Sequence, residues 1–344
     1  MFHVKQFRVF LPDVFHVKQK MTQFFKNVSR ETKIDVILQN VSRETQKSNI
    51  FEEICASLLK IKQRCDIITS SNILRACSRA IRIYFNERTA KMAKIIAFAN
   101  QKGGVGKTTS AVNVASSLGV IGFRTLIIDL DPQGNTTSGV GVAKKGLKNT
   151  TRELLLGEIT AKEAIIQTPY TNLSVIPTNV SLASAEFDLF DFSENEYRLK
   201  TVLEEVQNDF DYIIIDCPPS LGMLTINALS ACDGVVVPMQ CEFYALEGLS
   251  QLLISIKRIN KLYNSKLSVC GILVTMHNPR LLLSTQVIGE LKKHYADKLF
   301  ATTISRNVKL SEAPSYGKPV YYHDKRAKAT LEYIAVAKEL SERI

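Results

Sequence analysis

Short apolar runs separated by amphipathic stretches characterise the chain from residue 92 onward. Helical periodicity is clear at Leu246–Leu262 and Ser284–Tyr295. Strands that alternate with helices predict an α/β fold with a doubly wound, mostly parallel sheet and helices on both faces. The runs with the length and apolar content of strands buried on both faces are Lys94–Ala99, Thr125–Asp131, Asp211–Pro219, Gly234–Pro238 and Leu267–Val274.

A glycine-rich segment joins the first predicted strand to a helical stretch. Residues 100–109 read NQKGGVGKTT, and the helix-forming sequence SAVNVASSL follows directly. Glycines let backbone N–H groups close around phosphate oxygens, and the N-terminus of the following helix adds partial positive charge. In such a loop Lys107 would contact the β- and γ-phosphates, and the Thr108 hydroxyl would bind Mg²⁺. The segment therefore predicts a fold of the P-loop NTPase type that binds ATP and Mg²⁺. The residues expected to contact the nucleotide here are Lys102, Gly103, Gly104, Val105, Gly106, Lys107, Thr108 and Thr109.

Two further predicted strands end in acidic residues. Residues 125–135 read TLIIDLDPQGN, and the alternation of side chains along a strand places Asp129 and Asp131 on the same side of its end. Residues 211–219 read DYIIIDCPP, in which Asp216 ends an apolar run, as an Mg²⁺-holding Walker B strand requires. Phosphoryl transfer needs a group that orients the attacking water and a metal that neutralises charge. A turn or a helix cap is the alternative use of an aspartate after a strand.

The glycine-rich segment carries a second lysine, Lys102, at its front. This arrangement resembles the deviant Walker A motif of the ParA/MinD family of ATPases, and DLDPQGN resembles the second motif of the ParA type. The similarity extends over residues 92–344 and is closest to the chromosomal Soj/ParA branch. It implies that Lys102 reaches across an ATP-dependent homodimer to the partner's ATP. It also implies that Asp131 positions the water, that Asp129 supports the Mg²⁺ shell and that Lys102, Lys107 and Asp131 are catalytic, with Asp216 expected to hold Mg²⁺ through water.

A segment near the end, Ala301–Pro319, resembles the part of ParA-type proteins that closes over the adenine. The usual order there is Pro-Arg-Asn, and this chain has Ser305-Arg306-Asn307. The resemblance implies that Asn307 contacts the base. Because Ser305 replaces the proline, only a backbone contact would survive at that position.

The resemblance also implies a function. A member of this branch would be a partitioning ATPase for a chromosome or plasmid, located in the cytoplasm and associated with the nucleoid. It would dimerise on ATP, bind double-stranded DNA non-specifically and hydrolyse ATP when stimulated by a ParB-type partner. The two basic positions that serve DNA binding in this branch match Arg280 and Lys309. Contacts of this kind with phosphates weaken steeply with salt.

The alternative within the same family is a MinD-type membrane-cycling ATPase in division-site placement. Membrane attachment of that kind needs a basic amphipathic C-terminal helix. The last fifteen residues carry three glutamates against Lys338 and Arg343, so stable membrane binding is not expected. The apolar residues of this stretch, expected instead to cover the core, are Leu331, Ile334, Val336 and Leu340.

Charge and glycine are distributed unevenly. The whole chain has 44 Lys and Arg against 33 Asp and Glu, a net charge of +11. Residues 1–91 contain 17 basic and 8 acidic residues, whereas residues 92–344 contain 27 and 25, and all 16 glycines lie at or beyond Gly103. Composition therefore predicts a boundary near residue 92, and the ATPase part has no large excess of positive charge with which to bind DNA.

The first 91 residues contain two short motifs, each present twice. MFHVKQ and VFHVKQ occur at residues 1–6 and 14–19, and NVSRET occurs at residues 27–32 and 40–45. Both motifs can be encoded by one palindromic sequence, TGTTTCACGTGAAACA, read in two frames. That palindrome resembles the centromere-like parS site bound by ParB-type partition proteins.

We therefore interpret residues 1–91 as upstream non-coding DNA translated through a misplaced start codon. The alternative is a genuine N-terminal domain, such as the DNA-binding extension of some plasmid ParA proteins. Against it, residues 48–88 show modest helical periodicity and no convincing helix-turn-helix. Reduced cytosolic thiols are expected, because the seven cysteines include no CxxC pair.

Overall fold

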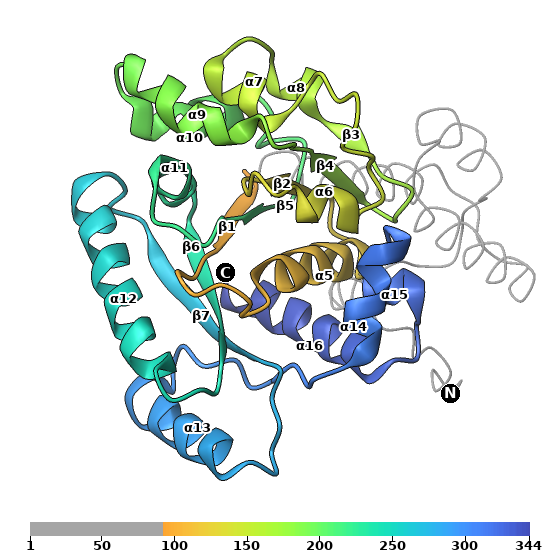
Figure 1. Ribbon diagram of the computed structural model, residues 1–344, viewed down its shortest axis with the longest axis vertical. Helices are drawn as coiled ribbons and strands as arrows, with labels where there is room; N and C mark the ends of the chain where they lie inside the picture. The colour runs from red at the N-terminus through yellow and green to blue at the C-terminus, as the bar shows by residue number, and fades with distance from the viewer. Residues whose placement is uncertain (1–91) are drawn as a thin grey trace, which may run out of the picture. The chain divides into compact units, whose positions relative to one another are not determined.

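The computed structural model describes residues 92–344, which fold around a single seven-stranded sheet (Figure 1). The strand order is β3-β4-β2-β5-β1-β6-β7, and every neighbouring pair is parallel except the edge pair β3–β4. The predicted doubly wound α/β fold is confirmed. The interpretation of residues 1–91 as translated non-coding DNA lies outside the described residues.

All five predicted strands are present: β1, β2 and β5 are shorter than predicted, β6 extends two residues further, and β7 is shifted by one residue. Two strands at one edge were not predicted, since β3 has two residues and β4 has four, which is too short for a clear pattern. The strands are β1 (Lys94–Phe98), β2 (Thr125–Asp129), β3 (Ile166–Gln167), β4 (Leu173–Ile176), β5 (Tyr212–Asp216), β6 (Gly234–Gln240) and β7 (Ser268–Thr275).

The helices connect the strands, and the helices predicted after the glycine-rich segment, at Leu246–Leu262 and at Ser284–Tyr295 appear as α5, α12 and α13. Three further short segments, η1 (Leu189–Asp191), η2 (Asn195–Tyr197) and η3 (Ala313–Tyr316), are 3-10 helices. The α-helices are α5 (Lys107–Val120), α6 (Asn135–Gly139), α7 (Thr151–Leu156), α8 (Ala161–Ala164), α9 (Leu182–Asp188), α10 (Arg198–Leu203), α11 (Met223–Ala231), α12 (Ala245–Leu262), α13 (Leu282–Tyr295), α14 (Val308–Glu312), α15 (Val320–His323) and α16 (Lys328–Arg343).

The sheet separates two hydrophobic cores. In the central strand β1, Ile95 and Ala97 belong to the core shared with α7 and α9 to α13, whereas Ile96 and Phe98 belong to the core shared with α5 and α16. Figure 1 shows α5 and α16 on one side of the sheet and α11 and α12 on the other. Because successive side chains of a strand point to opposite faces, an uninterrupted apolar strand must be covered twice.

The C-terminal helix α16 packs on α5 with one face. The Tyr333 hydroxyl lies 3.2 Å from the Ser110 hydroxyl of α5, and both side chains are buried. The prediction that Leu331 covers the core is wrong, since Leu331 is 61% exposed. The buried face follows the helical spacing of Tyr333, Val336 and Leu340, and Leu331 lies outside it. Ile334 is partly buried. The buried apolar residues of this helix are Ala329, Tyr333, Val336, Ala337 and Leu340.

Parallel pairing brings the carboxyl ends of the strands to one edge of the sheet. Phe98 at the end of β1 pairs with Asp216 of β5, and Asp216 pairs in turn with Asp129 of β2. The glycine-rich segment after β1 and the two acidic strand ends therefore meet at the same edge, where ligands bind in open α/β sheets. Within the described part of the chain, no helix is long and apolar enough to span a bilayer.

The close approach of α5 to the loop before β4 can be tested by adding one methyl group. A Cβ on Gly119 would lie 2.3 Å from the Thr171 carbonyl oxygen, a backbone atom that cannot move aside. We expect Gly119→Ala to lower the free energy of unfolding by about 1–3 kcal/mol, measured by urea denaturation. Gly289→Ala is the matched control, because its site in α13 is exposed and has no atom within 4 Å. It should raise stability by about 0.5–1 kcal/mol. Equal midpoints for Gly119→Ala and the wild type would contradict the packing described.

Candidate functional site

The glycine-rich loop between β1 and α5 leaves its backbone open. Gly104 and Gly106 have φ angles of +74° and +83°, which favour glycine, and no atom lies within 4 Å of a Cβ built on Gly103 or Gly104. Gly106 is the N-cap of α5, and no side chain caps this helix. The free N–H groups of the first turn and the positive end of the helix dipole therefore remain available to an anion.

Two strand ends hold this loop in place. The Gln240 side chain at the end of β6 donates to the Gly104 carbonyl at 2.6 Å, and the Thr275 hydroxyl at the end of β7 donates to the Val105 carbonyl at 2.8 Å. Neither residue was predicted. The sequence could have indicated both, because each is a polar residue at the carboxyl end of an apolar strand, where the site lies.

Lys107 is buried beneath the loop. The residue is only 7% exposed, and its Nζ donates to the Lys102 carbonyl at 3.1 Å. Burial lowers the pKa of Lys107, and the nearby charges of Asp216 and Asp131 raise it. The structure thus brings Lys107, Asp131 and Asp216 together, as predicted from three separate segments of the sequence.

Asp216 has the character of a cation ligand. Its residue is fully buried, the Thr136 hydroxyl donates to Oδ2 at 2.8 Å, and Oδ1 has no hydrogen-bond partner. Burial, with the nearby Asp129 charge, raises the pKa of Asp216 to about 8, while hydrogen bonds from Thr136 and Thr108 oppose the rise. A buried acceptor without a partner fits Mg²⁺, which takes one or two carboxylates and completes its shell with water and phosphate oxygens. Among residues 92–344, no group of three or more His, Cys, Asp or Glu could hold a metal by itself.

The two aspartates after β2 have different surroundings. Asp129 is fully buried, its Oδ2 accepts from the Thr137 N–H and hydroxyl at 2.7 Å each, and its Oδ1 accepts from the Asp131 N–H at 3.3 Å. Burial raises the pKa of Asp129 to about 6, against the hydrogen bonds from Thr137. Asp131 instead accepts from the Gln133 N–H at 2.9 Å and lies close enough to Lys107 to affect its pKa. The support of Asp129 for an Mg²⁺ shell stays a prediction.

The side chain of Lys102 projects at the surface. It forms an ion pair with Glu242, which follows β6, and the two side chains are 45% and 47% exposed. Its backbone is held by the Asn100 side chain, which accepts from the Lys102 N–H at 3.0 Å. The backbone of Lys102 is therefore fixed, whereas its ammonium group is restrained by one exposed contact.

The segment predicted to contact adenine has hydrogen bonds of its own. The Ser305 N–H and hydroxyl both donate to Glu332 Oε2 at 3.0 Å. The Asn307 side chain caps α14, with Oδ1 accepting from the Lys309 N–H at 2.9 Å. The base contacts of Ser305 and Asn307 stay predictions.

The two predicted DNA-binding residues differ in their pairing. Arg280 is exposed in the loop after β7, as predicted, and forms no ion pair within residues 92–344. Lys309 is partly buried, and its Nζ lies 2.8 Å from Glu312 Oε2.

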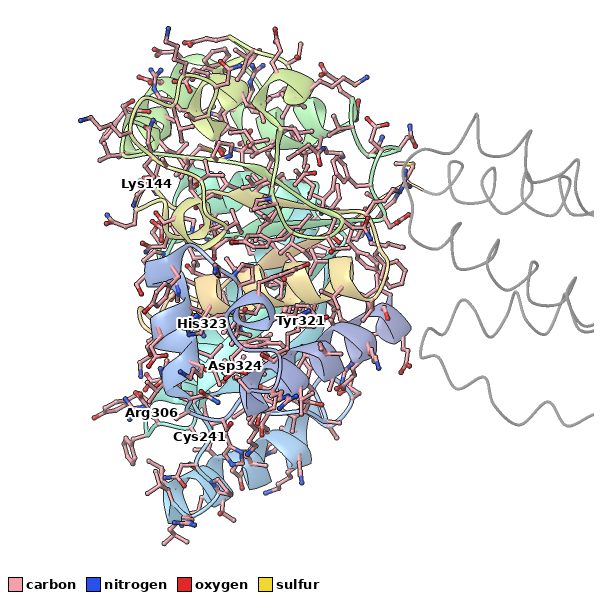
Figure 2. The ribbon with its side chains drawn as sticks, turned by 90° about the vertical axis from the view of Figure 1, so that its right-hand side faces the viewer. Lys144, Cys241, Arg306, Tyr321, His323 and Asp324 are labelled. Atoms are coloured by element: carbon pink, nitrogen blue, oxygen red, sulfur yellow. The ribbon has the colours of Figure 1, made fainter. Side chains whose placement is uncertain are left out.

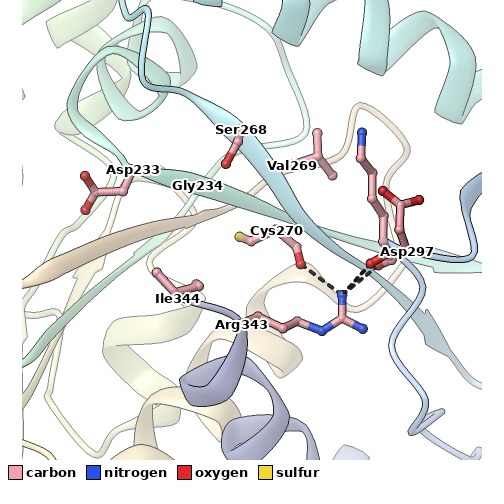
Figure 3. A pocket seen from close by; sticks show the side chains of 9 residues that line it. Asp233, Gly234, Ser268, Val269, Cys270, Asp297, Arg343 and Ile344 are labelled. Atoms are coloured by element: carbon pink, nitrogen blue, oxygen red, sulfur yellow. Dashed lines mark hydrogen bonds between the residues drawn. The ribbon is translucent and has the colours of Figure 1, made fainter.

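A cavity of about 310 Å³ lies at the opposite edge of the sheet, where β6 and β7 begin (Figure 3). The Arg343 guanidinium crosses it and donates to the carbonyls of Cys270 at 3.1 Å and Leu299 at 2.7 Å. Arg343 of α16 thus supplies hydrogen-bond donors to backbone carbonyls that line the cavity. None of the residues predicted to contact the nucleotide lines this cavity. The lining residues are Asp233, Gly234, Ser268, Val269, Cys270, Asp297, Lys298, Arg343 and Ile344.

Comparison with known proteins gives consistent similarities. A family described as an AAA domain matches residues 93–269. The sporulation initiation inhibitor protein Soj of Bacillus subtilis is 50% identical over 250 residues, which cover 73% of this chain and 99% of Soj. The chromosome partitioning protein ParA of Caulobacter vibrioides is 42% identical over 257 residues, which cover 74% and 96%.

Solved structures show the same arrangement. Cobyrinic acid a,c-diamide synthase from Mycobacterium smegmatis, with bound ADP and magnesium, has a TM-score of 0.65 and 35% identity, covering 73% of this chain and 95% of the synthase. A putative plasmid partition protein from Borrelia burgdorferi, bound to AMPPNP, has a TM-score of 0.63 and 28% identity, covering 73% and 100%.

The raised pKa of Asp216 predicts a pH-dependent stability. A carboxyl whose pKa is higher in the folded than in the unfolded state stabilises the fold most at low pH, and the contribution is lost as pH rises toward the folded pKa. The Tm of the nucleotide-free protein should therefore fall between about pH 5 and about pH 8. Asp216→Asn carries no charge at any pH and should show a smaller fall in differential scanning fluorimetry. Parallel Tm curves for the two proteins would contradict this assignment.

Proposed function

Because the chain belongs to the ParA/Soj family of partitioning ATPases, we propose that it binds ATP with Mg²⁺ and uses ATP hydrolysis to partition a chromosome or plasmid. ATP would drive formation of a homodimer that holds double-stranded DNA non-specifically in the nucleoid. A ParB-type partition protein would stimulate hydrolysis and release the DNA.

The observation that carries the proposal is the burial of Lys107 beside two carboxylates under an uncapped helix N-terminus. An ammonium group that has lost water in this way gains most when a polyanion contacts it. The open backbone at Gly103 and Gly104 provides room for phosphate oxygens next to it.

Each residue of the site has a proposed role in hydrolysis. Lys107 binds the β- and γ-phosphate oxygens, and Asp131 orients the attacking water. Asp216 and the Thr108 hydroxyl would hold Mg²⁺, which neutralises charge on the phosphates when bound. The Lys102 ammonium would reach the ATP of the partner subunit, and this requires it to leave Glu242.

DNA contact is proposed at Arg280 and Lys309. Arg280 is exposed on a loop at the same edge of the sheet as the phosphate loop, since it follows the carboxyl end of β7. Its guanidinium has no competing carboxylate in the described part of the chain. Two cations per subunit, Arg280 without an ion pair and Lys309 paired with Glu312, suit weak and non-specific binding to phosphates.

A MinD-type membrane cycle is the weaker alternative. Its attachment would need α16 to present an apolar face to lipid. The apolar face of α16 instead packs in the core, with Tyr333, Val336 and Leu340 at most 1% exposed. Leu331 is the one large apolar side chain of α16 that is exposed. A single exposed leucine is too little apolar surface to hold a helix on a bilayer.

Substitutions at Lys107 and Asp131 should separate binding from hydrolysis. Lys107→Ala should abolish ATP binding in isothermal titration calorimetry, because the phosphates lose their main cation. Asp131→Ala should retain ATP binding, accumulate a dimer in size-exclusion chromatography and lower ATP turnover by about 10²- to 10⁴-fold, the range for loss of a group that assists proton transfer. Turnover of Asp131→Ala at the wild-type rate would assign the water-positioning role elsewhere, with Asp129 the next candidate.

Arg280→Glu should weaken DNA binding without affecting the nucleotide site. In gel-shift titrations over a range of salt concentrations with ATP and Mg²⁺, affinity should fall and the log–log salt slope should become shallower by about one unit per lost phosphate contact. ATP-dependent dimerisation should be unchanged, since Arg280 lies outside the phosphate loop. Wild-type affinity at every salt concentration would place the DNA-binding surface elsewhere.

A further inference from the structure

A carboxylate pairs with Lys309, the lysine proposed to contact DNA. Glu312 lies one turn after Lys309 on α14, with Lys309 Nζ 2.8 Å from Glu312 Oε2. The pairing raises the pKa of Lys309 and lowers the pKa of Glu312, so both groups are held in their charged forms. The two side chains are 43% and 40% exposed, so the pair is reachable from solvent.

The same glutamate has a second partner. His323 Nε2 of α15 lies 3.3 Å from the same Oε2, and the His323 ring packs against Tyr316 with centroids 5.1 Å apart. The His323 side chain is 15% exposed, much less than Lys309. If Lys309 leaves, Glu312 therefore keeps a hydrogen-bond partner in a fixed position.

The surroundings of this pair are otherwise basic. Residues 305–328 contain six Lys and Arg but only two acidic residues, Glu312 and Asp324. Arg306, Lys318 and Arg326 are exposed and form no ion pair with any residue of the described part. Figure 2 views the face that carries Arg306 and His323. A polyanion approaching Lys309 therefore meets Glu312, which is in direct contact with the lysine, and Asp324, which acts on it only through its charge.

We propose that Glu312 is an intramolecular competitor of DNA phosphate for Lys309 and sets how tightly the protein holds DNA. The inference rests on the proposed function, in which Lys309 contacts DNA. An exposed ion pair is weak enough for a phosphate to displace. DNA binding then exchanges the Lys309–Glu312 pair for a Lys309–phosphate pair, while Glu312 remains with His323. The gain in binding free energy is smaller than an unpaired lysine would give, so the complex with DNA stays weak and dissociates quickly.

The test is removal of the charge of Glu312 without change of its shape. With ATP and Mg²⁺, Glu312→Gln in the full chain should bind non-specific duplex DNA about two- to fivefold more tightly, the range expected for an exposed pair. Its log–log salt slope should be steeper by up to about one unit, because Lys309 becomes free to contact a phosphate. Glu204→Gln is the matched control, since Glu204 is exposed at the end of α10 and forms no ion pair within residues 92–344. It should leave both quantities unchanged.

A double-mutant cycle separates competition from general charge. Glu312→Gln should have no effect when combined with Lys309→Gln, because no lysine is left to release. An equal gain in both backgrounds, or no gain in the wild-type background, overturns the inference. If the wild type binds DNA and Lys309→Gln weakens it while Glu312→Gln changes nothing, this inference alone fails. If neither the wild type nor Glu312→Gln binds DNA with ATP, the inference and the DNA-binding part of the proposed function fail together.

Discussion

The burial of one positive charge at the edge of the sheet determines how the rest of the site is built. Lys107 lies under its loop, where burial lowers its pKa and the charges of Asp216 and Asp131 oppose that shift. A charge without water is tolerated only where opposite charges and hydrogen bonds compensate it. Asp216 ends β5, the neighbour of β1, and Asp131 follows β2, the next strand on the same side, so the compensation exists only once β1, β5 and β2 are paired in parallel.

The same requirement explains the polar residues around the acids. Asp216 and Asp129 are both buried, and side-chain hydroxyls of α6 donate to them, Thr136 to the first and Thr137 to the second. One oxygen of Asp216 is left without a partner, whereas both oxygens of Asp129 have one. Both acids hold α6 to the sheet, but only Asp216 keeps an oxygen without a partner in the described part of the chain.

Lys102 and Lys309, the lysines proposed to act on other molecules, each have a glutamate beside them. Glu242 pairs with Lys102 and Glu312 pairs with Lys309, and all four side chains are between 40% and 47% exposed. Exposed pairs of this kind contribute little to the stability of a fold. They do hold a flexible cation in one place, so under the proposed function each lysine would exchange its glutamate for another partner. Arg280, by contrast, is exposed on its loop without such a partner in the described part of the chain.

The sequence alone determined the five long strands, the phosphate loop and the acids at the strand ends, because apolar runs and glycine spacing are local and strong signals. It also indicated an exposed Arg280, since a turn follows β7. Only the tertiary structure decided what these residues contact. The different hydrogen-bond partners of Asp129 and Asp131, the anchoring of the loop by Gln240 and Thr275, and the exposure of Leu331 were visible only in the folded structure. Such contacts are set by strand order and helix rotation, which no local pattern encodes.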